Sequence, residues 1–168
     1  MAKKVPAKKV KPIPEGYYSL TPYLIVKDAA RAIDYYKKAF GATELMRMPD
    51  PSGKIAHAEI KIGNSPIMLA DEFPERGPTG TRNPQALGDS SVVIALYVED
   101  VDTVAQKAVA AGGKLMFPVA DQFYGDRSGR LVDPFGHVWI IATHKEDVPP
   151  EEMQKRMEEW MKQQQKGG

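Results

Sequence analysis

Apolar and polar residues follow the same order twice along this chain. Each half opens with a short β-branched or aromatic run that predicts a strand, continues with apolar residues at helical spacing, and ends with further strand-like runs. In the first half we expect strands at 21–26, 43–48, 55–62 and 67–70 and a helix at 29–40. In the second half we expect strands at 91–98, 114–118, 121–124, 128–132 and 137–143 and a helix at 103–111. A last amphipathic helix is expected over 151–165.

The two halves align at a constant offset of 72 residues. Asp28 and Asp100 both suit a helix N-cap, because a short carboxylate accepts hydrogen bonds from the first free N–H groups of a helix. Further matched pairs are Val26 with Val98 and Gly41 with Gly113. The duplication predicts an α+β fold of tandem βαβββ modules. Their curled mixed sheet is expected to surround a concave cavity, with the helices on the outer face and an extra C-terminal helix.

Changes in composition divide the chain into five segments. Lysine and proline dominate the start, so we expect a flexible arm there; the alternative is an arm that binds anions or nucleic acid. Glycine and proline interrupt the middle, as they do in a linker. The segments are a basic N-terminal arm (1–19), the first module (20–72), a Pro/Gly-rich linker (73–90), the second module (91–147) and a C-terminal helix and tail (148–168).

The overall composition argues against several classes of protein. The net charge of +1 gives no global attraction to nucleic acid or to a membrane surface. The chain has no cysteine, which excludes disulfides and thiolate chemistry, and no apolar run is long enough to cross a bilayer. Since the N-terminus also lacks the apolar core of a signal peptide, a cytoplasmic location is expected.

Several short motifs carry a resemblance to a known family. They are Thr21-Pro22-Tyr23-Leu24, the helix from Ala32 to Gly41, His57-Ala58-Glu59-Ile60, Tyr124-Gly125-Asp126-Arg127 and Asp133-Pro134-Phe135-Gly136-His137-Val138-Trp139. With these motifs, residues 20–147 resemble the vicinal oxygen chelate superfamily of glyoxalase, bleomycin-resistance and dioxygenase proteins, and within it the PhnB-like branch. The resemblance implies the tandem βαβββ fold and a homodimer. It does not specify a reaction, because this fold hosts lyases, epimerases, dioxygenases and drug-binding proteins.

The resemblance also implies where a metal would bind. Metal-dependent members take His, Gln or Glu ligands from the first and last strands of each module, and the metal acts there as a Lewis acid. The corresponding positions here are Thr21, Val93, Ile67–Leu69 and Ile140. Because none of these residues is the His, Gln or Glu that such a site uses, we expect neither a family-type metal site nor a cofactor.

His57 and Glu59 lie two residues apart on one expected strand, so both side chains face the same side of the sheet. That side is not needed for helix packing. The pair is therefore a candidate for lining the cavity and a weaker candidate for catalysis, as a general base or hydrogen-bond donor. The alternatives are a mutually satisfied pair on a half-exposed face, a subunit contact, or a displaced metal site that includes His137 or His144.

Three tyrosines are candidates for contacting a flat ligand. Tyr23 and Tyr97 face the cavity by strand alternation, together with Thr21, and Tyr124 can join them. Their rings would stack on the ligand or cap it; the alternative is that they fill the core.

Two arginines flank the turn at residues 128–129. Inside a cavity, Arg127 and Arg130 would favour a ligand that carries a carboxylate or phosphate. The alternative is an ion pair with Asp126 or Asp133. The complete expected ligand-binding set is Thr21, Tyr23, His57, Glu59, Tyr97, Tyr124, Arg127 and Arg130.

Three functions remain open at this point. The first is a protein that binds a small molecule in its sheet cavity without the family metal. The second is a glyoxalase-type lyase or isomerase with an atypical or absent metal site. The third is an interaction module that uses the linker and the C-terminal helix, whose apolar stripe consists of Met153, Met157, Trp160 and Met161. The expected partners are a small-molecule ligand and a second copy of the chain, with neither nucleic acid nor a membrane.

Overall fold

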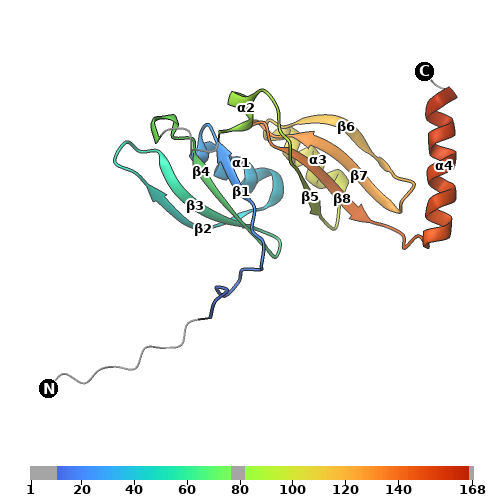
Figure 1. Ribbon diagram of the computed structural model, residues 1–168, viewed down its shortest axis with the longest axis horizontal. Coiled ribbons are helices and arrows are strands. Elements are labelled where there is room, and N and C mark those ends of the chain that lie inside the picture. The colour runs from blue at the N-terminus through green and yellow to red at the C-terminus, as the bar shows by residue number, and fades with distance from the viewer. Residues whose placement is uncertain (1–10, 77–81, 167–168) are drawn as a thin grey trace.

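The computed structural model describes residues 11–76 and 82–166 and contains two successive βαβββ modules (Figure 1). The first module comprises β1 (Tyr23–Val26), α1 (Ala29–Phe40), β2 (Thr43–Pro49), β3 (Ile55–Ile62) and β4 (Ser65–Asp71). The second comprises β5 (Val93–Tyr97), α3 (Val101–Ala110), β6 (Lys114–Asp121), β7 (Asp126–Val132) and β8 (Val138–His144). A 3₁₀ turn (Pro74–Arg76) and the short helix α2 (Pro84–Leu87) lie between them, and α4 (Pro150–Lys166) follows. Most of the expected N-terminal arm, residues 1–10, lies outside the described residues.

The helix ends follow from the local sequence. Asp28 caps α1 by accepting a hydrogen bond from the backbone N–H of Arg31 at 3.1 Å, and Gly41 ends the helix in the left-handed conformation, with φ of 66°. Asp100 caps α3 in the same way, so α3 begins at Val101, two residues before the expected start.

The edge strand β6 differs from the expectation. It runs without a break over residues 114–121, where the sequence pattern predicts two shorter strands. Irregular pairing with β7 on both sides of Phe117 accommodates Pro118, which cannot donate a ladder hydrogen bond. Tyr124 consequently lies in the turn after β6 rather than in a strand.

Each module forms its own four-stranded mixed sheet, with strand orders β1-β4-β3-β2 and β5-β8-β7-β6. β1 pairs in parallel with β4, and β5 pairs in parallel with β8; the other pairs are antiparallel. The α+β class and the tandem βαβββ order are confirmed. The expected curled sheet is divided into two, because β1 and β5 are edge strands that share no ladder within the described residues.

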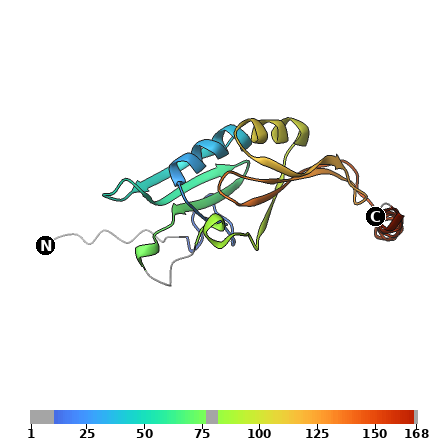
Figure 2. The ribbon, with the colours of Figure 1, turned by 90° about the horizontal axis from the view of Figure 1, so that it is seen from above.

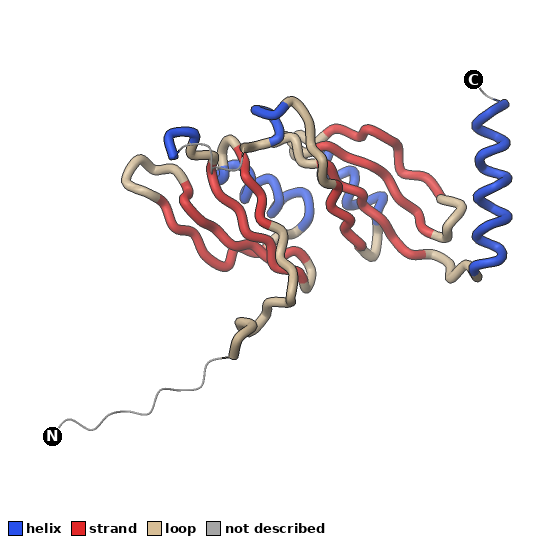
Figure 3. The backbone as a smooth tube through the Cα atoms, viewed as in Figure 1, coloured by secondary structure: helices blue, strands red, loops and turns tan. Residues whose placement is uncertain are grey.

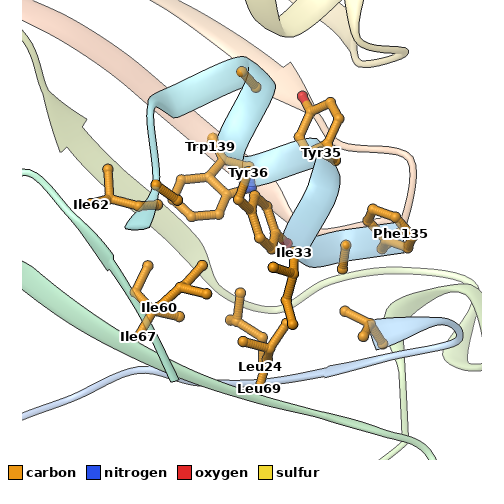
Figure 4. Packing of buried hydrophobic residues seen from close by; sticks show 14 of the residues in the cluster. Leu24, Ile33, Tyr35, Tyr36, Ile60, Ile62, Ile67, Leu69, Phe135 and Trp139 are labelled. Carbon is orange, nitrogen blue, oxygen red and sulfur yellow. The ribbon is translucent and has the colours of Figure 1, made fainter. Parts of the chain in front are cut away.

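The two modules are held together by packing between one helix of each. α1 and α3 pack against each other and lie on the same side of both sheets (Figure 2). A single core of buried apolar side chains from both modules lies beneath them. Trp139 of β8 is buried in this core beside Tyr36 of α1 (Figure 4). Its ring centroid lies 5.6 Å from that of Tyr36 and 4.8 Å from that of Phe40. The side of each sheet turned away from α1 and α3 is called its open face.

A buried carboxylate links the modules through hydrogen bonds. Asp133, in the turn between β7 and β8, is 4% exposed. Its carboxylate accepts bonds from the N–H groups of Phe135 and His137 at 2.9 and 3.0 Å. It also accepts bonds from the Tyr36 hydroxyl at 2.7 Å and the Trp139 indole N–H at 3.0 Å. Because Tyr36 belongs to α1, this turn fixes the second module against the first.

The C-terminal helix α4 lies beside the end of the second sheet (Figure 1). Its Trp160 ring contacts Phe123, with centroids 5.7 Å apart, and its Arg156 forms a bidentate ion pair with Glu146 at 2.8 and 2.9 Å. Trp160 and Met161 remain largely exposed. Among the described residues, no helix combines the length and the apolar character needed to span a membrane.

Candidate functional site

The open face of the first sheet carries polar side chains from β1 and β3. Leu24 and Ala58 belong to the core, so strand alternation turns Tyr23, His57 and Glu59 to the open face. The structure therefore brings these three predicted residues together on the expected side.

These side chains are connected by hydrogen bonds to one another and to Tyr17, which precedes β1. Figure 3 shows that the chain enters β1 from a loop. The Tyr17 hydroxyl donates to Oε2 of Glu59, and Oε1 of Glu59 lies 3.1 Å from Nε2 of His57. Nδ1 of His57 lies 2.9 Å from the Tyr23 hydroxyl. The tautomer with its proton on Nε2 satisfies both contacts, so neither ring nitrogen of His57 is free to act as a base.

The same contacts set the charges on this face. Hydrogen bonds from Tyr17 and then His57 lower the pKa of Glu59. Burial, and then the hydrogen bond to Glu59, raises the pKa of Tyr17 to about 12, and burial also raises the pKa of Tyr23. At neutral pH the face therefore presents one carboxylate and two uncharged phenols. Sequence reasoning missed Tyr17, whose partner is 42 residues away; its one local signal is an aromatic residue in a Lys/Pro-rich segment.

The variant Tyr17→Phe should lose about 1–2 kcal/mol in the free energy of unfolding at pH 7, because Glu59 loses its first hydrogen-bond donor. A carboxyl group whose pKa is lower in the folded state stabilises the fold at pH values above its unfolded pKa, which is about 4.5 for Glu59. This contribution is lost as the pH falls through the folded pKa. The difference between variant and wild type should therefore shrink on acidification below pH 4.5. Urea unfolding at several pH values measures it. Tyr18→Phe, at a 60% exposed position, is the matched control and should change little.

The open face of the second sheet carries its own hydrogen-bonded chain. The Tyr97 hydroxyl donates to Oδ2 of Asp126 at 2.7 Å, and Oδ1 of Asp126 accepts from Nδ1 of His144 at 2.7 Å. Nε2 of His144 lies 2.9 Å from Oδ1 of Asp147. Of these residues only Tyr97 belongs to the predicted set. The Asp126–His144 contact depends on the β7–β8 register, which places the two residues opposite each other and which no local motif encodes.

The other predicted residues lie apart from these two groups of hydrogen-bonded side chains. Tyr124 contacts Oγ of Ser128 at 3.1 Å, and the Arg130 guanidinium lies 5.5 Å from the centroid of the Phe117 ring. Thr21 lies two residues before the start of β1. The structure therefore spreads the predicted set over both modules instead of gathering it at one point.

Arg127 belongs to β7, which runs without a break through residues 128–129, so the turn expected there is wrong. Its side chain lies on the helix side of the second sheet. Its guanidinium binds both carboxylate oxygens of Asp102 in α3, at 2.7 and 2.8 Å, and reaches Asp121 at 3.2 Å. The Arg127 guanidinium is therefore engaged by Asp102 and Asp121 and does not lie beside the open-face residues Tyr23, His57 and Glu59. The alternative, an ion pair of Arg127 with Asp126 or Asp133, is also wrong. Adjacent residues of a strand face opposite sides of the sheet, so Arg127 faces α3 while Asp126 faces the open side.

A cleft of about 1250 Å³ lies between the modules. Its walls come from the segment before β1 and the β3–β4 turn on one side, and from β5, β8 and the start of α3 on the other. Apolar residues such as Leu20, Ile94 and Trp139 line it, and Tyr97 and His144 bring polar groups to it.

The residues at the family's metal positions do not fit a divalent cation. On β1 and β4 the neighbouring open-face residues are Tyr23 and Met68, and on β5 and β8 they include Ala95 and Ile140. None supplies the imidazole or carboxylate donors that such a site uses. Within residues 11–76 and 82–166, no three His, Asp or Glu side chains are grouped so as to hold a metal ion.

Residues 18–141 match the model of the Glyoxalase/Bleomycin resistance protein/Dioxygenase superfamily, and the chain belongs to that superfamily. An uncharacterised protein of Mycobacterium tuberculosis, Rv0887c, is 42% identical over 139 residues, which cover 83% of this chain and 82% of the relative.

Solved structures show the same fold. TioX from Micromonospora sp. ML1 is 26% identical, with a TM-score of 0.58 over 74% of this chain and 97% of TioX. The PhnB protein of Bacillus cereus is 18% identical, with a TM-score of 0.59 over 75% of this chain and 99% of its own. The expected resemblance to this superfamily and to PhnB-like proteins is thus confirmed.

Proposed function

We propose that this protein binds a small organic molecule on the open face of the first sheet without a metal ion. The observation that carries the proposal is the chain of hydrogen bonds from Tyr17 through Glu59 and His57 to Tyr23. It fixes two phenols, an imidazole and a carboxylate on one surface. Small-molecule sites commonly combine a few fixed polar groups of this kind with apolar walls.

Exposed methionines lie beside these polar groups on the same sheet. Met46 and Met48 of β2 lie opposite Glu59 and His57 of β3, and both are exposed, at 37% and 53%. Thioether side chains are flexible and polarisable, and they adapt to flat or irregular ligands. The ligand expected here is a partly apolar molecule whose polar end donates a hydrogen bond to the Tyr23 hydroxyl oxygen, which His57 holds in place.

The proposal predicts that a ligand found by thermal-shift screening stabilises the wild type and loses affinity for His57→Gln. The matched control is Lys61→Gln, which changes an exposed residue farther along the same side of β3. The screen includes Ni, Zn, Mn and Fe salts, and native mass spectrometry reports the bound species. Equal affinity for both variants, or a stoichiometric metal that raises the melting temperature, would contradict the proposal.

We also propose that the working form is a homodimer. β5 is an edge strand that begins at the exposed Val93, directly after the exposed Val92, and an exposed apolar edge can pair with another chain. In light scattering, the expected mass is twice the chain mass of 18.6 kDa. Val93→Glu should reduce it to the mass of one chain, and a monomeric wild type would contradict this part of the proposal.

A glyoxalase-type lyase or isomerase is the alternative for the same site. It would use His57 or Glu59 as the proton acceptor, but both nitrogens of His57 are occupied by Tyr23 and Glu59. We therefore expect no turnover of the hemithioacetal of methylglyoxal and glutathione. Turnover that is lost in His57→Ala would favour the enzyme over the binding protein.

A further inference from the structure

The hydrogen bonds of the second sheet connect a buried carboxylate, Asp126, with a partly exposed imidazole, His144, at the cleft between the modules. Asp126 has a side chain that is 8% exposed and uses both oxygens, one for Tyr97 and one for His144. His144 is 52% exposed, and both His144 and Tyr97 line the cleft. The imidazole is therefore held through Nδ1 by the buried Asp126, while its Nε2 lies on the exposed side, 2.9 Å from Oδ1 of Asp147.

Nε2 of His144 is the ring nitrogen that can exchange a proton with a molecule in the cleft. Its one contact among the described residues is with Asp147, whose side chain is fully exposed. An exposed ion pair of this kind contributes little and is readily exchanged for another partner. His57 differs, because both of its nitrogens are held by residues of the sheet.

The surroundings of His144 favour its cationic form. It faces Asp126 from β7, Tyr97 from β5 and Asp147 from the segment after β8, and the hydrogen bonds to Asp126 and then Asp147 raise the pKa of His144. The cleft lining also contains Glu99 and Asp100. An acidic rim around apolar walls disfavours anions, so the cleft fits an uncharged, largely apolar molecule.

We propose that His144 is a general-base residue for an uncharged ester-like molecule bound in the cleft, with Asp126 and Tyr97 as its positioning residues. Nε2 takes a proton from a water molecule as the water oxygen attacks the ester carbonyl. One O–H bond of water and the bond to the alcohol leaving group break, while a C–O bond and an Nε2–H bond form. Asp126 balances the imidazolium charge, and the proton then passes to the leaving alkoxide or to solvent.

The test uses the full-length protein and p-nitrophenyl acetate as the probe. The wild type should release p-nitrophenolate faster than buffer, and the rate should rise with pH through a midpoint above 6.5, the ordinary pKa of histidine. His144→Gln should lose at least about tenfold of the rate above buffer. Asp126→Asn should lower the rate and move the midpoint toward 6.5, a change that a purely structural role for Asp126 would not produce.

Two further variants separate this site from a reactive surface histidine. Ala95→Trp adds a large side chain to the cleft lining and should also lower the rate. His137→Gln changes a histidine that bonds to the Ile25 carbonyl, outside the cleft lining, and should keep the wild-type rate and pH profile. A wild-type rate in His144→Gln or in Ala95→Trp would overturn the proposal. Neither result bears on ligand binding at His57, so the two proposals fail independently.

Discussion

The variant Asp133→Ala is expected to lose about 3–5 kcal/mol in the free energy of unfolding. Its carboxylate is buried and accepts four hydrogen bonds, two from the turn and two from the side chains of Tyr36 and Trp139. Truncation leaves those donors unpaired in the core. Since a domain of this size has a total stability of about 5–15 kcal/mol, a large part of it depends on this one residue.

Urea unfolding followed by circular dichroism measures this loss. If Asp133→Ala does not fold, Asp133→Asn keeps the volume and one acceptor and should still be clearly destabilised. Tyr36→Phe removes one of the four bonds and should lose about 1.5–3 kcal/mol, less than Asp133→Ala. Asp121→Ala is the control, because its side chain is 81% exposed and its ion pair with Arg127 lies at the surface. Equal stability of Asp133→Ala and Asp121→Ala would contradict the role assigned to the turn.

Replacing Trp139 by alanine should also lose about 3–5 kcal/mol, through the cavity left in the shared core. Trp139 is 1% exposed and contacts Tyr36 and Phe40 of the first module. Its loss should therefore weaken the packing between modules as well as the second sheet, and both modules should unfold together at a lower urea concentration.

The chain offers a matched control in its second tryptophan. Trp160 of α4 is 45% exposed and contacts Phe123 at the surface, so Trp160→Ala should change the free energy of unfolding by less than about 1 kcal/mol. The remaining tryptophan in each variant gives a separate fluorescence signal for its own position. Similar losses for the two variants would contradict the view that the modules share a core.

The sequence predicts the elements best where their ends are encoded locally. Helix α1 spans the expected residues 29–40, because Asp28 and Gly41 mark its ends with short-range hydrogen bonds. β3 likewise covers the expected residues 55–62, where apolar and polar residues alternate. The division into two sheets is not encoded in this way. It depends on how α1 packs on α3 and on contacts such as Tyr36 with Asp133, which are 97 residues apart.

The candidate site residues, too, are predicted best where the local sequence determines their positions. Tyr23, His57 and Glu59 lie together as expected, because alternation along two strands determines which side each residue faces. Tyr17 and the Asp126–His144 pair were not predictable, since a loop path and a strand register bring them into contact. Arg127 is a candidate in the sequence because it flanks an expected turn at residues 128–129, but β7 continues through these residues and turns Arg127 toward α3.

A crystal structure of the protein purified without added metal, with anomalous data collected above the absorption edges of Zn and Ni, tests the central claim most directly. The predicted result is electron density for an organic molecule on the open face of the first sheet, within hydrogen-bonding distance of Tyr23 or His57, and no anomalous peak coordinated by protein side chains. A transition metal held between β1 and β4, or between β5 and β8, with a ligand bound to it would contradict the account.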